Sequence, residues 1–267
     1  MAILTVSREY GSGGRDIGRL VAERLNYSYV DKEKLFRDLD EAGSRWGRVA
    51  REVDEVCPTL WERHDWQYRG YVAALEALIL EYAARDRVVI IGRGGAILLR
   101  EVPFCLRVRL VAPLEVRIER VMVRESLDRE AAARLIRQVD NERECYIKAV
   151  YGLAWEAEQF YDLVLNTGLL TYQEVADLLI RELENKDALA TPDAKARLQD
   201  LTLAAALKAR LATDPRLFIP TLEVRWEGDT LVVAGIIHTP KERQLVEQLS
   251  REAAGTRPLR FALHHRG

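Results

Sequence analysis

The residues whose types and spacing point to chemistry stand near the start of the chain, in the segment SREYGSGGRDIG, Ser7 to Gly18. Gly11, Gly13 and Gly14 let the backbone turn sharply and bring several N–H groups close to one anion. The short apolar run before the segment indicates a buried strand, and apolar residues recur at helical spacing after it. The positive end of that helix dipole would point at the same place. The segment therefore predicts a phosphate-binding loop at a strand-to-helix junction.

This loop departs from the usual phosphate-loop pattern G-x-x-x-x-G-K-[ST]. Arg8 stands where the first glycine belongs and Gly14 where the lysine belongs, and Arg15 followed by Asp16 replaces the magnesium-binding hydroxyl. Arg15 opens the helix, where a cation is unfavourable unless an anion lies nearby. We therefore predict that Arg15 holds phosphate in place of the lysine, and that Ser12 and the loop glycines bind the same phosphate. An ordinary glycine-rich turn is the alternative on spacing alone.

The elements that must position this loop alternate between strands and helices. Each candidate strand is short and apolar and is followed by polar or helical sequence. The candidates are Ala2 to Val6, Tyr27 to Val30, Arg87 to Ile91, Cys105 to Val111 and Asp162 to Asn166. This alternation predicts an α/β fold, a five-stranded parallel sheet covered by helices. Because ligands bind at the carboxyl ends of parallel strands, the loop, Asp31, Arg93 and Asn166 are expected along one rim.

From about Ile3 to Leu183 the chain resembles the cytidylate-kinase-like branch of the P-loop nucleoside monophosphate kinases. The resemblance rests on five segments in the family's order: TVSREYGSGGRDIGRLVAERL, YSYVDKEKL, VVIIGRGGAILL, VDNERECYIKAVYG and YDLVLNTGLLTYQEVADLLI. A basic residue after GSGG is itself typical of this branch, so the missing lysine does not by itself mark an inactive copy. The resemblance implies a P-loop kinase domain at 1–184, with an acceptor-binding helical insertion at about 31–80 and a lid at about 124–150.

The resemblance also implies roles for residues outside the loop. Arg93 aligns with the arginine that holds the acceptor phosphate, although Gly94 stands where the family has an acid. Asp31 corresponds to the start of the acceptor-binding region, and capping the next helix is an equally simple role for it. Arg143 and Lys148 lie in the segment that resembles the lid over the donor phosphates.

The reaction that the resemblance implies is phosphoryl transfer from ATP or another nucleoside triphosphate, with Mg²⁺, to a nucleoside monophosphate such as CMP or dCMP. The expected catalytic set is Arg15, Arg143 and Asp16. Asp16 is expected to bind the ion directly or through water, and Glu9 is a second candidate. Two alternatives stay open. One is a catalytically silent nucleotide-binding sensor that signals through a second domain, and the other is a P-loop kinase for a different small acceptor.

A polar stretch at 185–196 predicts a linker, and a different unit follows at 197–267. Its pattern is helix, hairpin, helix and strand, an α+β unit in the order αββαβ, with Thr239 and Glu242 expected to form a capping box. The phrases DPRL and GDTLVVAG resemble the BON domain, a small module associated with binding. The resemblance implies a small ligand or self-association through this unit. An appendage that packs on the kinase or mediates dimerisation is the alternative.

Composition agrees with a cytoplasmic enzyme. The 267 residues are 48% hydrophobic, and 40 basic residues against 42 acidic ones leave a net charge of −2 with the signs interspersed. We therefore expect no nucleic-acid partner. We expect no membrane span either, because no apolar stretch approaches the ~20 residues that a membrane helix needs. Cys57, Cys105 and Cys145 are far apart and odd in number, which favours free thiols over a disulfide or a metal site.

Overall fold

The computed structural model describes residues 2–41, 57–59 and 65–265, and the chain forms two compact units. The first unit comprises Met1–Lys34, Asp54–Pro58 and Arg85–Ala194, and the second comprises Leu35–Val53, Thr59–Ala84 and Lys195–Gly267. Helix α4 (Trp66–Ala84) therefore groups with the C-terminal residues, although it lies between strands β2 and β3 of the first unit along the chain.

The first unit is built on the five-stranded parallel sheet that the sequence predicts. Its strand order is β2-β3-β1-β4-β5. The strands are β1 (Ile3–Arg8), β2 (Ser28–Val30), β3 (Val88–Ile91), β4 (Cys105–Val111) and β5 (Leu163–Asn166). β1 is buried along its whole length because it pairs with β3 on one side and β4 on the other.

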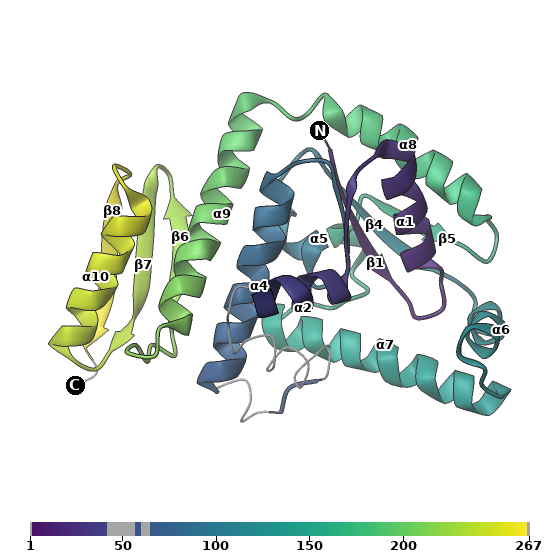
Figure 1. Ribbon diagram of the computed structural model, residues 1–267, viewed down its shortest axis with the longest axis horizontal. Coiled ribbons are helices and arrows are strands. Elements are labelled where there is room, and N and C mark those ends of the chain that lie inside the picture. Colours follow the sequence, from purple (N-terminus) through teal and green to yellow (C-terminus); the bar gives the residue numbers. More distant parts are fainter. Residues whose placement is uncertain (1, 42–56, 60–64, 266–267) are drawn as a thin grey trace. The chain divides into compact units, whose positions relative to one another are not determined.

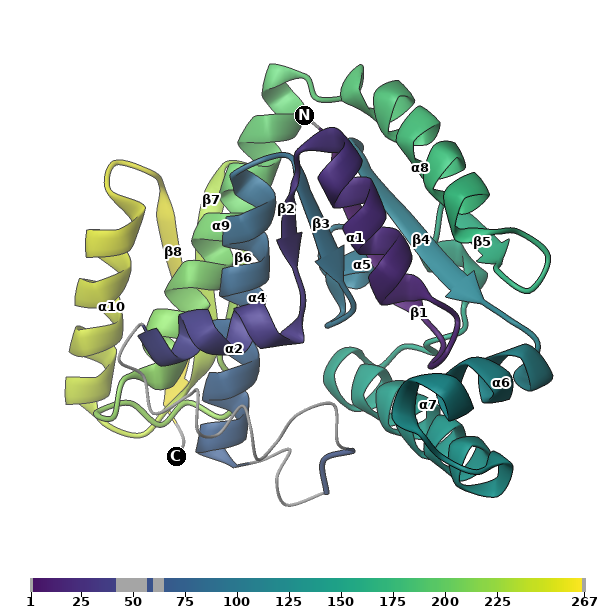
Figure 2. The same ribbon diagram turned by 45° about the vertical axis from the view of Figure 1, so that its right-hand side comes forward.

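Helices α1 (Gly14–Leu25), α5 (Gly95–Leu98) and α8 (Tyr172–Asp187) pack against this sheet, whereas α6 (Leu114–Glu125) and α7 (Arg129–Tyr151) lie beyond the carboxyl ends of its strands (Figures 1 and 2). The 3₁₀ helix η2 (Glu158–Phe160) precedes β5. Ile17 of α1 and Leu179 of α8 pack in one core with Leu4 and Val6 of β1 and Val108 of β4. Because alternate residues of β1 face these two helices, α1 and α8 lie on the same face of the sheet.

The C-terminal part of the second unit has the element order αββαβ that the sequence predicts. The elements are α9 (Pro192–Thr213), β6 (Glu223–Glu227), β7 (Thr230–Ile237), α10 (Pro240–Ala254) and β8 (Leu259–His265). β6 and β7 form an antiparallel hairpin, and β8 pairs with β7 in parallel. The predicted capping box of Thr239 and Glu242 is present at the start of α10. Leu207 and Leu211 of α9 pack on Leu231 and Val233 of β7 to form the core.

Helix α2 (Lys32–Glu41) begins at the carboxyl end of β2. Part of the region predicted as an acceptor-binding insertion, residues 42–56 and 60–64, lies outside the described residues. Within the described ranges, none of the helices combines the length and apolarity that a bilayer crossing requires.

The expectation of three free cysteines is wrong. Cys57 and Cys145 form a disulfide, with their Cα atoms 5.2 Å apart. A separation of 88 residues carries no sequence signal for pairing, since only the fold brings these two segments together. Cys105 is free, and burial raises the pKa of its thiol to about 12.

Candidate functional site

The predicted loop joins the buried end of β1 to the first turn of α1. Gly11 and Gly13 have φ angles of +86° and +83°, a backbone conformation that suits glycine. Gly13 is the N-cap of α1 and makes no side-chain cap. The first N–H groups of this helix therefore have no side-chain acceptor at the cap, which is the arrangement that binds an anion.

Hydrogen bonds from neighbouring elements hold the loop in place. The Ser12 hydroxyl donates to the Glu9 carbonyl over 2.9 Å, and the Ser12 backbone N–H donates to the same oxygen over 3.2 Å. Thr167, at the carboxyl end of β5, donates its hydroxyl to the Ser12 carbonyl over 2.8 Å. Arg120 of α6 in turn donates to the Thr167 hydroxyl over 2.9 Å. Both donors of Ser12 are thus used inside the loop, and Ser12 supports its shape.

Beside the loop lies a cavity of about 350 Å³, which we call the loop cavity. It brings together Arg15, Asp16, Arg143 and the three loop glycines, as the sequence predicts for a phosphate site. Its lining residues are Arg8, Glu9, Tyr10, Gly11, Gly13, Gly14, Arg15, Asp16, Arg19, Arg124, Glu125 and Arg143. Five of them are arginines and three are acids, so the cavity is locally positive in a chain of net charge −2.

Arg15 and Asp16 open α1 and are both exposed. The Arg15 guanidinium lies 2.7 Å from a carboxylate oxygen of Glu33. Burial on its own would raise the pKa of Glu33, but a backbone hydrogen bond and the charge of Arg15 outweigh burial and lower it. Because both side chains are about half exposed, this pair is weak, and Arg15 can exchange Glu33 for a phosphate at small cost.

Arg143 connects helix α7 to the loop. Its guanidinium donates to the Arg8 carbonyl over 3.0 Å and lies 3.7 Å from Asp140. Asp140 accepts a hydrogen bond from the backbone N–H of Tyr10 over 2.8 Å. The guanidinium carbon of Arg143 lies 5.7 Å from the centroid of the Tyr10 ring, and the guanidinium carbon of Arg124 lies 4.7 Å from the same centroid. These contacts position two cations over the loop cavity from α6 and α7.

A second cavity, of about 30 Å³, lies at the turn after β3, and we call it the turn cavity. Arg93 is 3% exposed here and has a φ of +56°, a strained value for a residue other than glycine. A Cβ on Gly92 would come within 1.9 Å of the Arg8 guanidinium, so the missing side chain lets Arg8 lie against the turn. Arg8 and Arg93 thus lie beside each other's strands, at the ends of β1 and β3.

An aromatic wall borders the turn cavity. Trp155 donates its indole N–H to the Ser7 hydroxyl over 3.0 Å, and the Tyr161 hydroxyl lies 3.1 Å from the same oxygen. The guanidinium of the buried Arg109 lies 4.3 Å from the centroid of the Trp155 ring. These residues belong to no recognisable motif, so nothing in the sequence indicated that they line a cavity.

The two cavities share Arg8 and Arg143, which line both. An anion in either cavity would therefore lie beside the same two arginines. Sequence reasoning singled out Arg143 but noted Arg8 only as a departure from the loop pattern. Its position at the carboxyl end of β1 was the signal that could have identified it.

Three predicted site residues, Ser12, Asp31 and Lys148, line neither cavity. Asp31 accepts a hydrogen bond from the Lys34 backbone N–H over 3.0 Å, which is the capping role that the sequence left open. Lys148 is exposed in the last turn of α7. The roles of Asp31 and Lys148 in binding acceptor and donor stay predictions.

The described residues include no group of three His, Cys, Asp or Glu side chains that could enclose a metal ion. Glu9 accepts a hydrogen bond from the Ala112 backbone N–H over 3.1 Å and lies 3.5 Å from Arg117, so its carboxylate already has partners. Asp16 is an exposed carboxylate on the wall of the loop cavity. A single carboxylate suits Mg²⁺ that keeps waters and phosphate oxygens as its other ligands.

Residues 3–169 match the model of the Cytidylate kinase-like family. The cytidylate kinase of Methanocaldococcus jannaschii is 26% identical over 186 residues, which cover 68% of this chain and 98% of that protein. The uronate isomerase of Corynebacterium glutamicum is 38% identical over 104 residues, 39% of this chain, but the match spans only 20% of that relative's length. An uncharacterized protein from Eubacterium ventriosum has the same fold, with a TM-score of 0.55 at 22% identity, over 69% of this chain and 99% of its own.

Proposed function

Because this chain belongs to the Cytidylate kinase-like family, we propose that it transfers a phosphoryl group from ATP or another nucleoside triphosphate to a nucleoside monophosphate, with CMP or dCMP as the acceptor. The observation that carries the proposal is that the loop cavity and the turn cavity share Arg8 and Arg143. Phosphoryl transfer needs little covalent chemistry from the protein and much positioning of charge. Two phosphate sites that share Arg8 and Arg143 supply such positioning of charge.

The donor phosphates bind in the loop cavity. The N–H groups at the start of α1 and the positive end of its dipole hold them, and Arg15 takes the place of the usual lysine. A guanidinium binds phosphate oxygens in pairs through its fork, whereas lysine offers a point charge. Arg15 therefore holds the donor phosphates together with Arg124, which lines the same cavity.

The acceptor phosphate binds in the turn cavity, against Arg93 and the glycines on either side of it. Arg93 is nearly fully buried, so a phosphate paired with it is shielded from water and the charge-assisted hydrogen bonds are strong. The acceptor base is then recognised by the insertion proposed at about 31–80, which includes residues outside the described ranges.

Arg8 and Arg143 stabilise the negative charge of the phosphoryl group as it passes between the two cavities. Arg143 is 8% exposed and is held by the Arg8 carbonyl and by Asp140, so its guanidinium needs little reorganisation during transfer. Mg²⁺ bound with the donor would neutralise phosphate charge, and we propose Asp16 as the residue that would hold it, directly or through water.

For the remaining chain we propose the division that the sequence suggests, a kinase domain at 1–184, a connection at 185–196 and a BON-like binding module at 197–267. The αββαβ order of α9 to β8 supports the last of these assignments. Helix α7 covers most of the lid proposed at about 124–150, and Arg143 on this helix contacts the loop.

A panel of nucleoside monophosphates tests the proposed reaction. The full-length protein with ATP and Mg²⁺ should form ADP fastest, and with the highest kcat/KM, when CMP or dCMP is present. Tight ATP binding with no acceptor-dependent ADP formation across the panel would contradict the proposed activity. Fastest turnover with a different small phosphate acceptor would overturn the assigned substrate alone.

Substitutions separate the two phosphate sites. Arg93→Ala should raise the KM for the monophosphate by about tenfold or more, because the acceptor loses its buried cation. Arg100→Ala, which removes a half-exposed arginine a few residues later, is the matched control and should leave KM unchanged. Arg143→Ala should lower kcat by about 10²-fold or more, because its guanidinium serves the transferring group. An effect of Arg93→Ala on kcat alone would refute the assignment of the turn cavity.

A further inference from the structure

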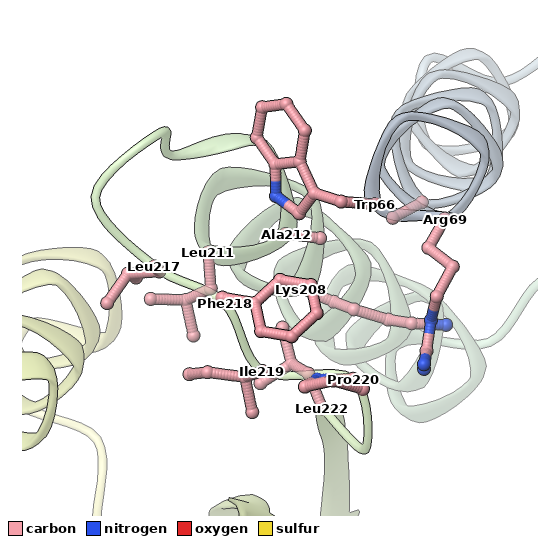
Figure 3. Close-up of a pocket in the computed structure, with 11 residues that line it drawn as sticks. Trp66, Arg69, Lys208, Leu211, Ala212, Leu217, Phe218, Ile219, Pro220 and Leu222 are labelled. Atoms are coloured by element: carbon pink, nitrogen blue, oxygen red, sulfur yellow. The ribbon is translucent and has the colours of Figure 1, made fainter. Parts of the chain in front are cut away.

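The second unit contains a cavity of its own, of about 40 Å³, which we call the α9 cavity (Figure 3). Its walls come from α4, from α9 and from the segment between α9 and β6. The lining residues are Trp66, Arg69, Ala73, Lys208, Leu211, Ala212, Leu217, Phe218, Ile219, Pro220 and Leu222. Four of them, Leu211, Leu217, Ile219 and Leu222, also belong to the core of the unit, so the apolar wall is firmly held.

Two aromatic side chains extend this apolar surface. Phe218 is 49% exposed, although its neighbours Leu217 and Ile219 are buried. Figure 3 shows the rings of Phe218 and Trp66 beside the cavity, with the aliphatic chains of Leu211, Leu217 and Ile219 toward the left of the view. A volume of this size holds a few water molecules, so it suits the end of a small apolar group whose remainder lies against the two rings.

The cationic side chains of the α9 cavity differ in their partners. Lys208 lies 3.0 Å from a carboxylate oxygen of Glu76, which is itself nearly buried. Arg69 is half-buried, and none of the described carboxylates pairs with its guanidinium. Burial accordingly lowers the pKa of Arg69. A guanidinium that has lost water without gaining an anion is destabilised, and a bound carboxylate would offset that loss.

We propose that the α9 cavity binds a small amphipathic carboxylic acid, whose aromatic or branched aliphatic end packs on Phe218 and Leu211 and whose carboxylate pairs with Arg69. One unpartnered cation matches one negative charge, whereas the nucleotide triphosphate group carries several. Glu76 beside Lys208 repels further negative charge. The α9 cavity thus selects a monoanion with an apolar body, and it lies in a different unit from the loop and turn cavities.

Ligand-observed NMR with the full-length protein tests this proposal. The probes are 3-phenylpropionate, its neutral amide and the matching amine, 3-phenylpropylamine. We expect the carboxylate to bind with a Kd of about 1–10 mM, in line with the efficiency of ligands of this size. It should bind at least about fivefold more tightly than the amide, because a charge-assisted hydrogen bond is the stronger one. Equal affinity for acid and amide would overturn the proposal.

Variants locate the binding. Arg69→Gln should abolish the preference for the acid over the amide, and Arg69→Glu should shift the preference to the amine. Phe218→Ala should weaken acid and amide alike, because it removes apolar contact only. Arg181→Gln, an exposed arginine on α8, and Leu169→Ala, an apolar side chain that is 82% exposed, are the matched controls and should change nothing.

A further variant keeps the test decisive if the Arg69 variants fail to fold. Ala212→Phe fills the α9 cavity and leaves both cations in place, so acid binding should be lost. Unchanged acid binding in Ala212→Phe, or an intact preference for the acid in a folded Arg69→Gln protein, would refute the assigned site. ATP affinity, measured in the same samples, should stay at the wild-type value because the loop cavity is untouched.

Discussion

Replacement of Gly13 by alanine probes the geometry of the loop directly. Gly13 has a φ of +83°, and a left-handed backbone costs an L-residue about 1–2 kcal/mol. An added Cβ would also come within 2.3 Å of the Tyr172 ring. The Tyr172 ring must therefore move, and the Arg120 guanidinium, which lies 5.2 Å from the ring centroid, would lose this contact. We therefore expect Gly13→Ala to lower the free energy of unfolding by about 2–5 kcal/mol, the backbone cost plus about 1–3 kcal/mol for the crowding.

Gly152 offers a matched control. It ends α7 with a φ of +69°, and an added Cβ there would meet nothing within 4 Å. Gly152→Ala should therefore show the backbone cost of about 1–2 kcal/mol without the crowding. The difference between the two variants isolates the contact with Tyr172, and Tyr172→Ala introduced beside Gly13→Ala should remove most of that difference.

Urea unfolding followed by circular dichroism gives the stability of each variant, and calorimetric titration with ATP gives its affinity. Gly152→Ala should bind ATP as the wild type does. Gly13→Ala should bind it at least about tenfold more weakly, a loss of about 1.4 kcal/mol, because the loop N–H groups no longer converge on one anion. If Gly13→Ala binds ATP as tightly as Gly152→Ala, the loop is not the donor phosphate site.

Three further outcomes are expected. Arg15→Ala should lower turnover by about 10²-fold or more and Arg19→Ala by clearly less, as measured by ADP formation, and equal small losses would contradict the role of Arg15. Asp162→Asn should cost about 1 kcal/mol of unfolding free energy at pH 7. Burial favours a raised pKa for Asp162, but hydrogen bonds from Arg107 lower it below its ordinary value. The contribution of Asp162 to stability is therefore present above about pH 4 and is lost as pH falls through the folded-state pKa. The free energies of unfolding of variant and wild type, measured by urea titration, should converge in acid. A difference that stays constant with pH would refute this prediction. Removal of residues 195–267 should make the remainder aggregate, because α4 loses the hydrogen bonds from Thr202 and Lys208 of α9 and the apolar cavity wall that α9 shares with it. A soluble monomer in light scattering would contradict this prediction.

Local sequence determined the strands and the loop. The five apolar runs became strands with bounds within two residues of those predicted, since β-strands in a parallel sheet are buried on both faces and so read as continuous apolar segments. The glycines at positions 11 and 13 specified the loop because their positive φ angles are unfavourable for other residues. The αββαβ order of the C-terminal part followed from equally local signals, a capping box and a hairpin turn.

Tertiary structure alone decided which distant groups meet. Arg8 and Arg143 are 135 positions apart, and they come together because α7 crosses the carboxyl end of β1. The pairing of Cys57 with Cys145 and the grouping of α4 with α9 likewise join segments far apart in the chain. Helical and strand periodicity reports which face of an element is buried but not which element covers it. The physical reason is that local conformation depends on neighbours in the chain, whereas a binding site depends on packing between elements whose order in space the pattern does not encode.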